Sequence, residues 1–283
     1  MPSPVSETPF EVAIPGGVLH GHVGGEGPPA LLLHGGAAVT DYTDGCAREL
    51  DGVFRTMRYQ QRGTYPSVAD PPYSIEAHVA DAVRVLDRFE IDRGWAIGHS
   101  WGGHLALHLA VSHPERLLGV VCVAPLGAFR DVLAEQDANL RRGLTEAQIA
   151  RVEEVERRRR EGVVTDPELV ERMSILWPRW FAEPESAAPC PITHIGARCS
   201  TEVNSSLSEH FAAGTLARQL PGLGLPALFV HGDRDALPLR SSTATAALIP
   251  GAVVATLPDS GHFPWLECPG ELRLAVEDFL AKP

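Results

Sequence analysis

The first part of the chain alternates short apolar runs with longer segments in which apolar residues recur every three or four positions. The apolar runs, which predict strands, cover residues 30–33, 54–59, 95–97 and 117–123. The segment 75–89 has helical spacing, with Val79, Val83 and Leu86 on one face and charged residues on the others. Continuous apolar strands are typical of a parallel sheet buried on both faces. The alternation therefore predicts an α/β fold with a doubly wound, mostly parallel sheet.

A hairpin is predicted before these units, and the same alternation resumes near the end of the chain. Residues 10–14 and 18–23 flank Pro15-Gly16-Gly17, which favours two antiparallel strands joined by a turn. In the last part of the chain, strands are predicted at 227–230 and 253–257, and helices at 242–248 and 270–280.

The region between about 126 and 221 is mostly helical in pattern and shows no clear strand. Because it interrupts one sheet, we predict an α/β core formed by 1–125 and 222–283 and a helical cap formed by 126–221. Ligands of open α/β sheets bind at the carboxyl edge of the strands, so the cap is expected to cover that edge. The cap segment contains three Glu–Arg pairs at i,i+4 spacing with the glutamate first, a pattern that indicates a solvated helix face. They are Glu153–Arg157, Glu154–Arg158 and Glu156–Arg160.

Three aromatic residues crowd into one short stretch of this cap. Trp177, Trp180 and Phe181 lie within six residues and are followed by three prolines. Two interpretations stay open: the aromatic side chains line a substrate pocket, or they anchor the cap to the core.

Charge and composition exclude some classes of binding partner for this protein. The formal net charge of −12 argues against nucleic acid and against anionic membranes. No apolar run approaches the roughly 18–20 residues that span a bilayer, and residues 1–8 lack the pattern of a secretory signal. The five cysteines include no C-x-x-C pair, which favours a reduced, cytoplasmic protein. We therefore expect a small-molecule substrate, and the oligomeric state stays open.

The motif Gly98-His99-Ser100-Trp101-Gly102 follows an apolar strand and precedes a helical run. G-x-S-x-G in this context is typical of a nucleophile elbow, a strained turn that exposes a serine hydroxyl. Small residues at 98 and 102 allow close approach of the backbone. Ser100 is the candidate nucleophile.

A serine hydroxyl needs a base, and the base needs a group that orients it. His262 follows the last predicted strand and is the candidate base. Asp233 and Asp235 both follow the preceding strand, and Asp235 is favoured because it lies further into the turn. The order Ser100, Asp235, His262 is the Ser…Asp…His order of α/β-hydrolases. Asp235 is expected to raise the pKa of His262 above its ordinary value of about 6.5.

The backbone N–H of Trp101 and that of Gly36, in His34-Gly35-Gly36, are the candidate donors to an oxyanion. No cofactor is expected. His104 and His108 have i,i+4 spacing but lack an apparent third ligand, so no metal site is predicted.

Together these motifs resemble the α/β-hydrolase superfamily over nearly the whole chain. Within it the chain is similar to proline iminopeptidases, on His34-Gly35-Gly36, Gln61-Arg62-Gly63 and Trp101 after the serine. It departs from them at Ala37-Ala38, where Pro-Gly is usual, and at Gln60, where Asp is usual. The resemblance implies cap carboxylates that hold a substrate amine, and Glu202 and Glu209 are the candidates; exposed helix charge is the alternative.

The prediction is a serine hydrolase that cleaves an ester, amide or lactone of a small molecule through an acyl-serine intermediate. Three alternatives stay open: an N-terminal aminopeptidase, an acyltransferase or cyclase, and a non-catalytic ligand-binding module.

Overall fold

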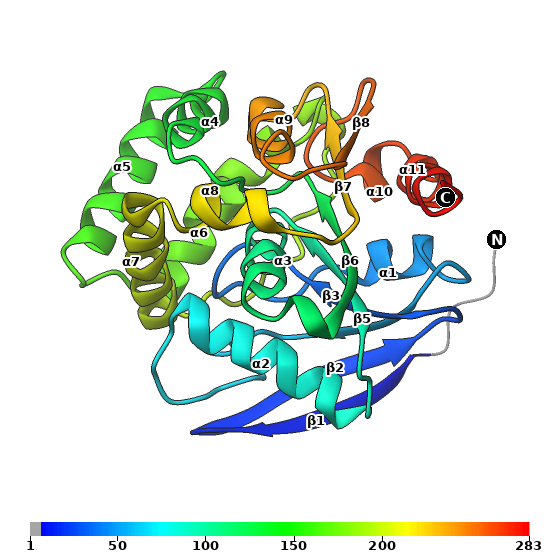
Figure 1. Cartoon of the computed structure of the whole chain (residues 1–283). Coiled ribbons are helices and arrows are strands. Elements are labelled where there is room, and N and C mark those ends of the chain that lie inside the picture. Colours follow the sequence, from blue (N-terminus) through cyan, green and yellow to red (C-terminus); the bar gives the residue numbers. More distant parts are fainter. Residues whose placement is uncertain (1–6, 283) are drawn as a thin grey trace.

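The computed structural model describes residues 7–282, which fold around one twisted sheet with helices on both faces (Figure 1). The strands are β1 (Thr8–Ile14), β2 (Gly17–Gly24), β3 (Pro29–Leu33), β4 (Arg55–Tyr59), β5 (Gly94–His99), β6 (Leu117–Val123), β7 (Ala227–Gly232) and β8 (Val253–Leu257). They lie in the order β1-β2-β4-β3-β5-β6-β7-β8. β1–β2 and β2–β4 are antiparallel, and every later pair in that order is parallel. The predicted doubly wound, mostly parallel sheet is confirmed.

Two apolar cores, one on each face of the sheet, hold the helices in place. The longer helices of the chain before and after the cap are α2 (Ile75–Arg88), α3 (Trp101–Ser112), α9 (Arg240–Ala246) and α11 (Glu271–Leu280), with the short α1 (Asp44–Glu49) and α10 (Pro264–Glu267). On β3, Leu31 and Leu33 belong to the core under α2 and α3, whereas Leu32 belongs to the core under α1 and α11. This alternation is the period of two expected for a strand buried on both sides.

The segment between β6 and β7 is helical, as its pattern predicts. It contains α4 (Val132–Arg141), α5 (Glu146–Arg160), α6 (Asp166–Leu176), α7 (Ala197–Ala213) and α8 (Thr215–Gln219), with the 3₁₀ turns 177–180, 184–186 and 220–222. These helices lie beside the carboxyl edge of the sheet (Figure 1). On α5 only Val152 and Val155 are buried, so most of that helix faces solvent.

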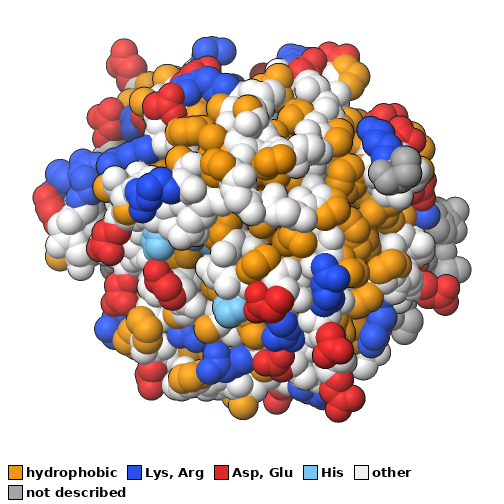
Figure 2. Space-filling model, in the orientation of Figure 1, with side chains coloured by type: hydrophobic (Ala, Val, Ile, Leu, Met, Phe, Trp, Pro, Cys, Tyr) orange, Lys and Arg blue, Asp and Glu red, His pale blue; other side chains and the backbone are white. Residues whose placement is uncertain are grey.

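The predicted ion pairs along α5 are wrong in detail. Arg157 pairs with Glu154 and Glu161, and Arg159 pairs with Glu156. The reason is packing between helices, because Arg158 reaches Glu168 of α6 instead. Glu153 reaches Arg141 of α4. Figure 2 shows acidic and basic side chains mixed over this side of the molecule, in agreement with a solvated, ion-paired face.

Candidate active site

The turn between β5 and α3 holds Ser100 in a backbone conformation that residues with a side chain rarely adopt. Its φ and ψ are 54° and −117°. The Ser100 N–H donates to the Val123 carbonyl (2.9 Å), and the Ser100 carbonyl accepts from the Leu126 N–H (3.0 Å). These bonds tie the turn to the end of β6, so the strain is held by the neighbouring strand.

Gly98 and Gly102 are required by close approach in this turn. A Cβ on Gly98 would collide with the carbonyl of Gly102, and a Cβ on Gly102 would collide with the carbonyl of Leu33. The expectation that small residues flank the serine therefore has a direct steric reason, and the turn has the geometry of a nucleophile elbow.

His262 and Asp235 lie in the loops after β8 and β7, two neighbouring strands. His262 Nδ1 is 2.7 Å from Asp235 Oδ2, and the two side chains are only 3% and 0% exposed. The other carboxylate oxygen, Oδ1, accepts from the Leu237 N–H (2.8 Å). Asp233 is exposed, whereas the Asp235 carboxylate is buried against the imidazole. The structure thus brings Asp235, and not Asp233, to the histidine.

Burial dominates the titration of this pair because it disfavours both charged forms. It raises the pKa of Asp235 to about 7. It lowers the pKa of His262 to about 3, so the expectation that Asp235 raises the pKa of His262 is wrong. The imidazole is therefore neutral at neutral pH, which is the form that can accept a proton.

His99, the residue before the serine, contacts the turn that carries His262. The His99 and His262 ring centroids are 4.5 Å apart, and His99 Nε2 lies 2.8 Å from the His262 carbonyl oxygen. Within the described residues, no hydrogen bond joins the Ser100 hydroxyl to His262. Catalytic hydrogen bonds are commonly long before substrate binds, so this geometry is compatible with a serine–histidine pair.

His99 and Tyr42 are two residues of this site that sequence reasoning missed. Burial keeps the pKa of His99 well below its ordinary value, so the ring is neutral and its Nε2–H donates to the His262 carbonyl. Its Nδ1 then accepts from the Tyr42 hydroxyl (2.8 Å). The only signal in the sequence was the position of His99 inside the elbow motif; Tyr42 lies in a loop with no such signal.

Trp180 and Glu267 hold the histidine turn from the cap side. The Trp180 ring stacks on His262, with centroids 4.3 Å apart and planes 31° apart. The Trp180 carbonyl accepts the His262 N–H (2.9 Å). Glu267 accepts backbone N–H groups from Ala182, Gly261 and Phe263 at 2.8–3.0 Å. Glu267 was also missed, although it follows the histidine by five residues on the next helix.

The loop after β3 runs past the serine. A Cβ on Gly35 would lie 2.8 Å from Ser100 Cβ, so this loop and the elbow are in contact. Gly36 has φ +65°, which favours glycine. His34 Nε2 accepts the Gln61 N–H (3.1 Å), and Gln61 Oε1 accepts from the Trp101 indole (3.0 Å). Gln60 and Gln61 therefore support the loop on which Gly36 lies.

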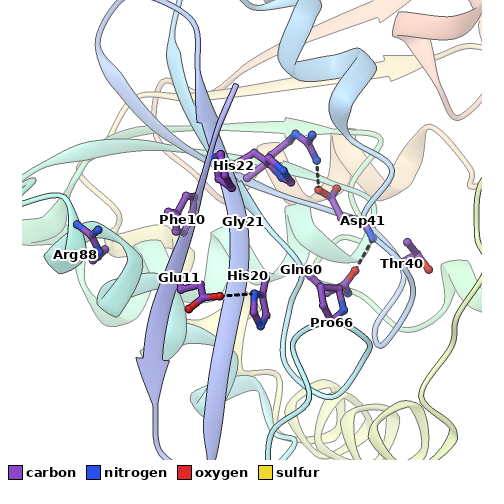
Figure 3. A pocket seen from close by; sticks show the side chains of 12 residues that line it. Phe10, Glu11, His20, Gly21, His22, Thr40, Asp41, Gln60, Pro66 and Arg88 are labelled. Carbon is purple, nitrogen blue, oxygen red and sulfur yellow. Dashed lines mark hydrogen bonds and ion pairs between the residues drawn. The ribbon is translucent and has the colours of Figure 1, made fainter. Parts of the chain in front are cut away.

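Neither of two sizeable cavities is lined by Ser100, Asp235 or His262. One, of about 1140 Å³, lies among the cap helices. Its wall includes Trp180, whose ring also contacts His262, together with Leu140, Met173, Leu176 and charged side chains of α4 and α5. The other, of about 660 Å³, lies beside the β1–β2 hairpin and is shown in Figure 3.

The hairpin cavity of Figure 3 contains none of Ser100, Asp235 and His262. Two pairs of its polar side chains are in contact, Glu11 with His20 (3.2 Å) and Arg58 with Asp41 (2.7 Å). Gln60 joins it to the loop after β3 by donating to the Val39 carbonyl (2.7 Å). Gln60 therefore connects the wall of this cavity to that loop.

His104 and His108 are buried on α3, with their Nε2 atoms 3.1 Å apart. His104 Nδ1 is bound to the carbonyls of Leu126 and Gly127. In residues 7–282, no group of three or more His, Cys, Asp or Glu side chains is placed to hold a metal ion.

Comparison with known proteins identifies the family of the chain. The family model described as the alpha/beta hydrolase fold matches residues 28–269. The chain belongs to the α/β-hydrolase family. This α/β-hydrolase is 29% identical over 271 residues to a 2-hydroxymuconate semialdehyde hydrolase from Pseudomonas putida, covering 92% of this chain and 90% of the relative.

Solved structures show the same fold. An alpha/beta fold family hydrolase from Bacillus anthracis superposes with a TM-score of 0.75 at 20% identity, covering 96% of this chain and 99% of that one. Naproxen esterase from Bacillus subtilis gives a TM-score of 0.66 at 16% identity, covering 98% and 92%. At these identities the likeness is one of fold.

The remaining residues predicted for substrate binding in this hydrolase lie in the cap. Trp177 and Phe181 are buried and pack on Phe263, with centroids 4.6 and 5.1 Å away. These two side chains anchor the cap to the histidine turn, whereas Trp180 reaches the cavity. Glu202 is bound by Arg198 (2.8 Å) and Glu209 is exposed, both on α7. Their role with a substrate amine stays a prediction.

No helix within residues 7–282 is both long enough and apolar enough to cross a membrane.

Proposed function

We propose that this α/β-hydrolase cleaves a small carboxylic ester, amide or lactone through an acyl-serine intermediate. The observation that carries the proposal is the buried pair of His262 Nδ1 and Asp235 Oδ2, 2.7 Å apart, at the strand ends beside a strained Ser100. A neutral imidazole oriented by a carboxylate is the base that a serine hydroxyl needs.

In the proposed reaction, Ser100 Oγ attacks the substrate carbonyl carbon while its proton passes to His262 Nε2. Asp235 holds the imidazole with its proton on Nδ1 and balances the imidazolium charge. The proton then passes from Nε2 to the leaving alcohol or amine. Water next attacks the acyl-serine, giving its proton to His262, and the acid leaves as Ser100 recovers the proton.

Two backbone N–H groups support stabilisation of the tetrahedral oxyanion. In the described part of the chain, neither the Trp101 nor the Gly36 N–H has a hydrogen-bond acceptor, so both are free to donate. Trp101 is also the first residue of α3, whose N-terminus favours a developing negative charge.

The cap cavity supports a substrate of modest size. Its volume of about 1140 Å³ is somewhat above the roughly 300–1,000 Å³ of typical small-molecule sites, and Trp180, whose ring contacts His262, lies in its wall. We infer that the substrate's apolar part packs against Trp180 and that its carbonyl lies over Ser100.

One observation favours a second substrate. The relative from Pseudomonas putida is named a 2-hydroxymuconate semialdehyde hydrolase, and it matches this chain over nearly all of both proteins. The second candidate function is therefore hydrolysis of 2-hydroxymuconate semialdehyde or a compound like it.

Active-site labelling combined with a substrate panel tests both candidates. A fluorophosphonate probe should label the wild type and fail to label Ser100→Ala. The panel would contain p-nitrophenyl esters, lactones, aminoacyl arylamides and 2-hydroxymuconate semialdehyde, with products identified by mass spectrometry. Turnover of esters or lactones supports the first candidate, and turnover of the semialdehyde alone supports the second.

Adding alcohols and amines to the same assays distinguishes hydrolysis from acyl transfer. Hydrolysis predicts the free acid as the main product at all concentrations of added nucleophile. Predominant transfer to the added alcohol or amine would make the acyltransferase alternative the better account. A wild type that is neither labelled nor active would contradict catalysis.

A further inference from the structure

We propose that Trp180 is itself a catalytic residue: its indole face stabilises the imidazolium that His262 becomes when it takes the proton of Ser100. This inference rests on the proposed function and adds a group that acts on the reacting base. No electron transfer or further reactant is involved, since only the serine proton moves, from Oγ to Nε2.

The first support is the stacking geometry. The two ring centroids are 4.3 Å apart and the planes differ by 31°, so the imidazole lies over the indole face. A cation within about 6 Å of a tryptophan face is attracted by the ring quadrupole, and the attraction grows when water is excluded. His262 is 3% exposed, so the imidazolium would form in such a water-poor place.

The second support is that the contact is held from several sides. The Trp180 carbonyl accepts the His262 N–H (2.9 Å), so both the ring and the backbone of Trp180 engage the same histidine. A Cβ on Gly261 would lie 2.6 Å from both Trp180 O and Ala182 N, which means that the cap segment is packed directly on this turn. Glu267 links Ala182 and Gly261 through one oxygen. These contacts together hold the indole over the imidazole.

The other charged and titratable groups around His262 contact atoms other than the face of the imidazole that Trp180 covers. Asp235 binds Nδ1 at the ring edge. His99 packs nearby through a ring that burial keeps neutral. His231 lies 3.6 Å from Asp235, and Glu267 binds backbone groups. Of the groups named here, only Asp235 brings a carboxylate into contact with the imidazole ring.

Substitutions of Trp180 separate the π face from simple bulk. Trp180→Met keeps an apolar side chain but removes the π face, and Trp180→Phe keeps a weaker one. We expect kcat to fall about 5- to 30-fold in Trp180→Met and less in Trp180→Phe. The matched control is Trp95→Met, at the opposite end of β5 and packed on Phe54 and Phe279.

The decisive readout is the protonation of His262 in the resting protein, followed by ¹⁵N NMR of the imidazole. Loss of the indole face should lower the pH at which the His262–Asp235 pair takes up its proton, in the order wild type, Phe, Met. Trp95→Met should leave that pH unchanged. The same titration in Ser100→Ala with and without Trp180→Met needs no turnover.

An unchanged or raised titration pH in folded Trp180→Met and Trp180→Phe would overturn the proposal, even if kcat falls, because the indole would then act only on substrate or on water. Circular dichroism and Tm establish that each variant is folded. If the wild type is not labelled by the fluorophosphonate, the proposed function fails separately from this inference.

Discussion

The carboxyl edge of the sheet and the outer surface of the cap are built in opposite ways. At the edge, Ser100, Asp235 and His262 lie in turns held by buried hydrogen bonds and by glycines that tolerate no Cβ. On α5, the charged residues form exposed ion pairs whose partners differ from those expected from spacing. A buried polar network has one arrangement in which all its hydrogen bonds are made, whereas exposed ion pairs can exchange partners at little cost in free energy. The comparison teaches that substitutions at the edge should change the rate strongly and those on the cap surface weakly.

The largest expected effect is at the proposed nucleophile. Ser100→Ala should lower kcat by ~10⁴-fold or more, because removal of one member disables the whole triad. His262→Ala should be similar, and the double variant should be no slower than either one. Steady-state kinetics on the best panel substrate measures this.

Ser174→Ala is the control for that experiment. Ser174 lies on α6 of the cap and donates to the Val170 carbonyl. Its substitution should leave kcat unchanged. Comparable decreases in kcat for Ser174→Ala and Ser100→Ala would contradict the expected difference between the sheet edge and the cap.

The next effect distinguishes two carboxylates of one loop. Asp235→Asn should lower kcat by about 10⁴-fold, because an amide at this position favours the wrong imidazole tautomer. Asp233→Asn, at an exposed position, should leave kcat nearly unchanged. If Asp233→Asn is the slower of two folded variants, the assignment of the orienting acid is wrong.

The pH dependence should follow the buried pair. Asp235 and His262 share a hydrogen bond, so they titrate together. The bridge between them already holds one proton, and a proton added to the pair occupies Nε2 and blocks the base. Because the pKa of Asp235 is raised to about 7, kcat should be full above that pH and fall about tenfold per unit below it.

A pH–rate profile in buffers of constant ionic strength measures this limb, with a solvent isotope effect to establish that proton transfer limits the rate. A profile that is flat from about 5 to 9 under those conditions would contradict proton uptake by the Asp235–His262 pair near pH 7.

The smallest expected effect is on the cap surface. Glu202→Gln and Glu209→Gln should leave KM for aminoacyl arylamides and for neutral esters unchanged, because Glu202 is bound by Arg198 and Glu209 is exposed. KM is measured for matched substrates with and without a free amine. A selective rise in KM for the free amines would place a carboxylate subsite in the cap and make the aminopeptidase the better account.

Local pattern predicted much of the fold because each strand and helix is marked by its own residues. Leu117–Val123 is a continuous apolar run, and β6 has the same bounds. The elbow was predictable because Gly98 and Gly102 have no substitute at their positions. The Asp235–His262 pair followed from strand order, since loops after neighbouring parallel strands meet at one edge.

Contacts that depend on the docking of the cap or on the path of a loop had no signal in the sequence. The stacking of Trp180 on His262 joins residues 82 positions apart through the docking of the cap, for which no local pattern exists. The Tyr42–His99 bond depends on the path of a loop. The pKa of His262 was mispredicted because the sequence shows the neighbouring carboxylate but not the depth of burial, which here has the larger effect.

The central claim, an acyl-serine on the edge of the sheet, is tested most directly by trapping that intermediate. Wild type mixed rapidly with a p-nitrophenyl ester should release a burst of p-nitrophenol close to one equivalent of enzyme. Acid quenching and peptide mass spectrometry should then place the acyl group on Ser100. An acyl group on another residue, or turnover at the wild-type rate in Ser100→Ala, would contradict the account.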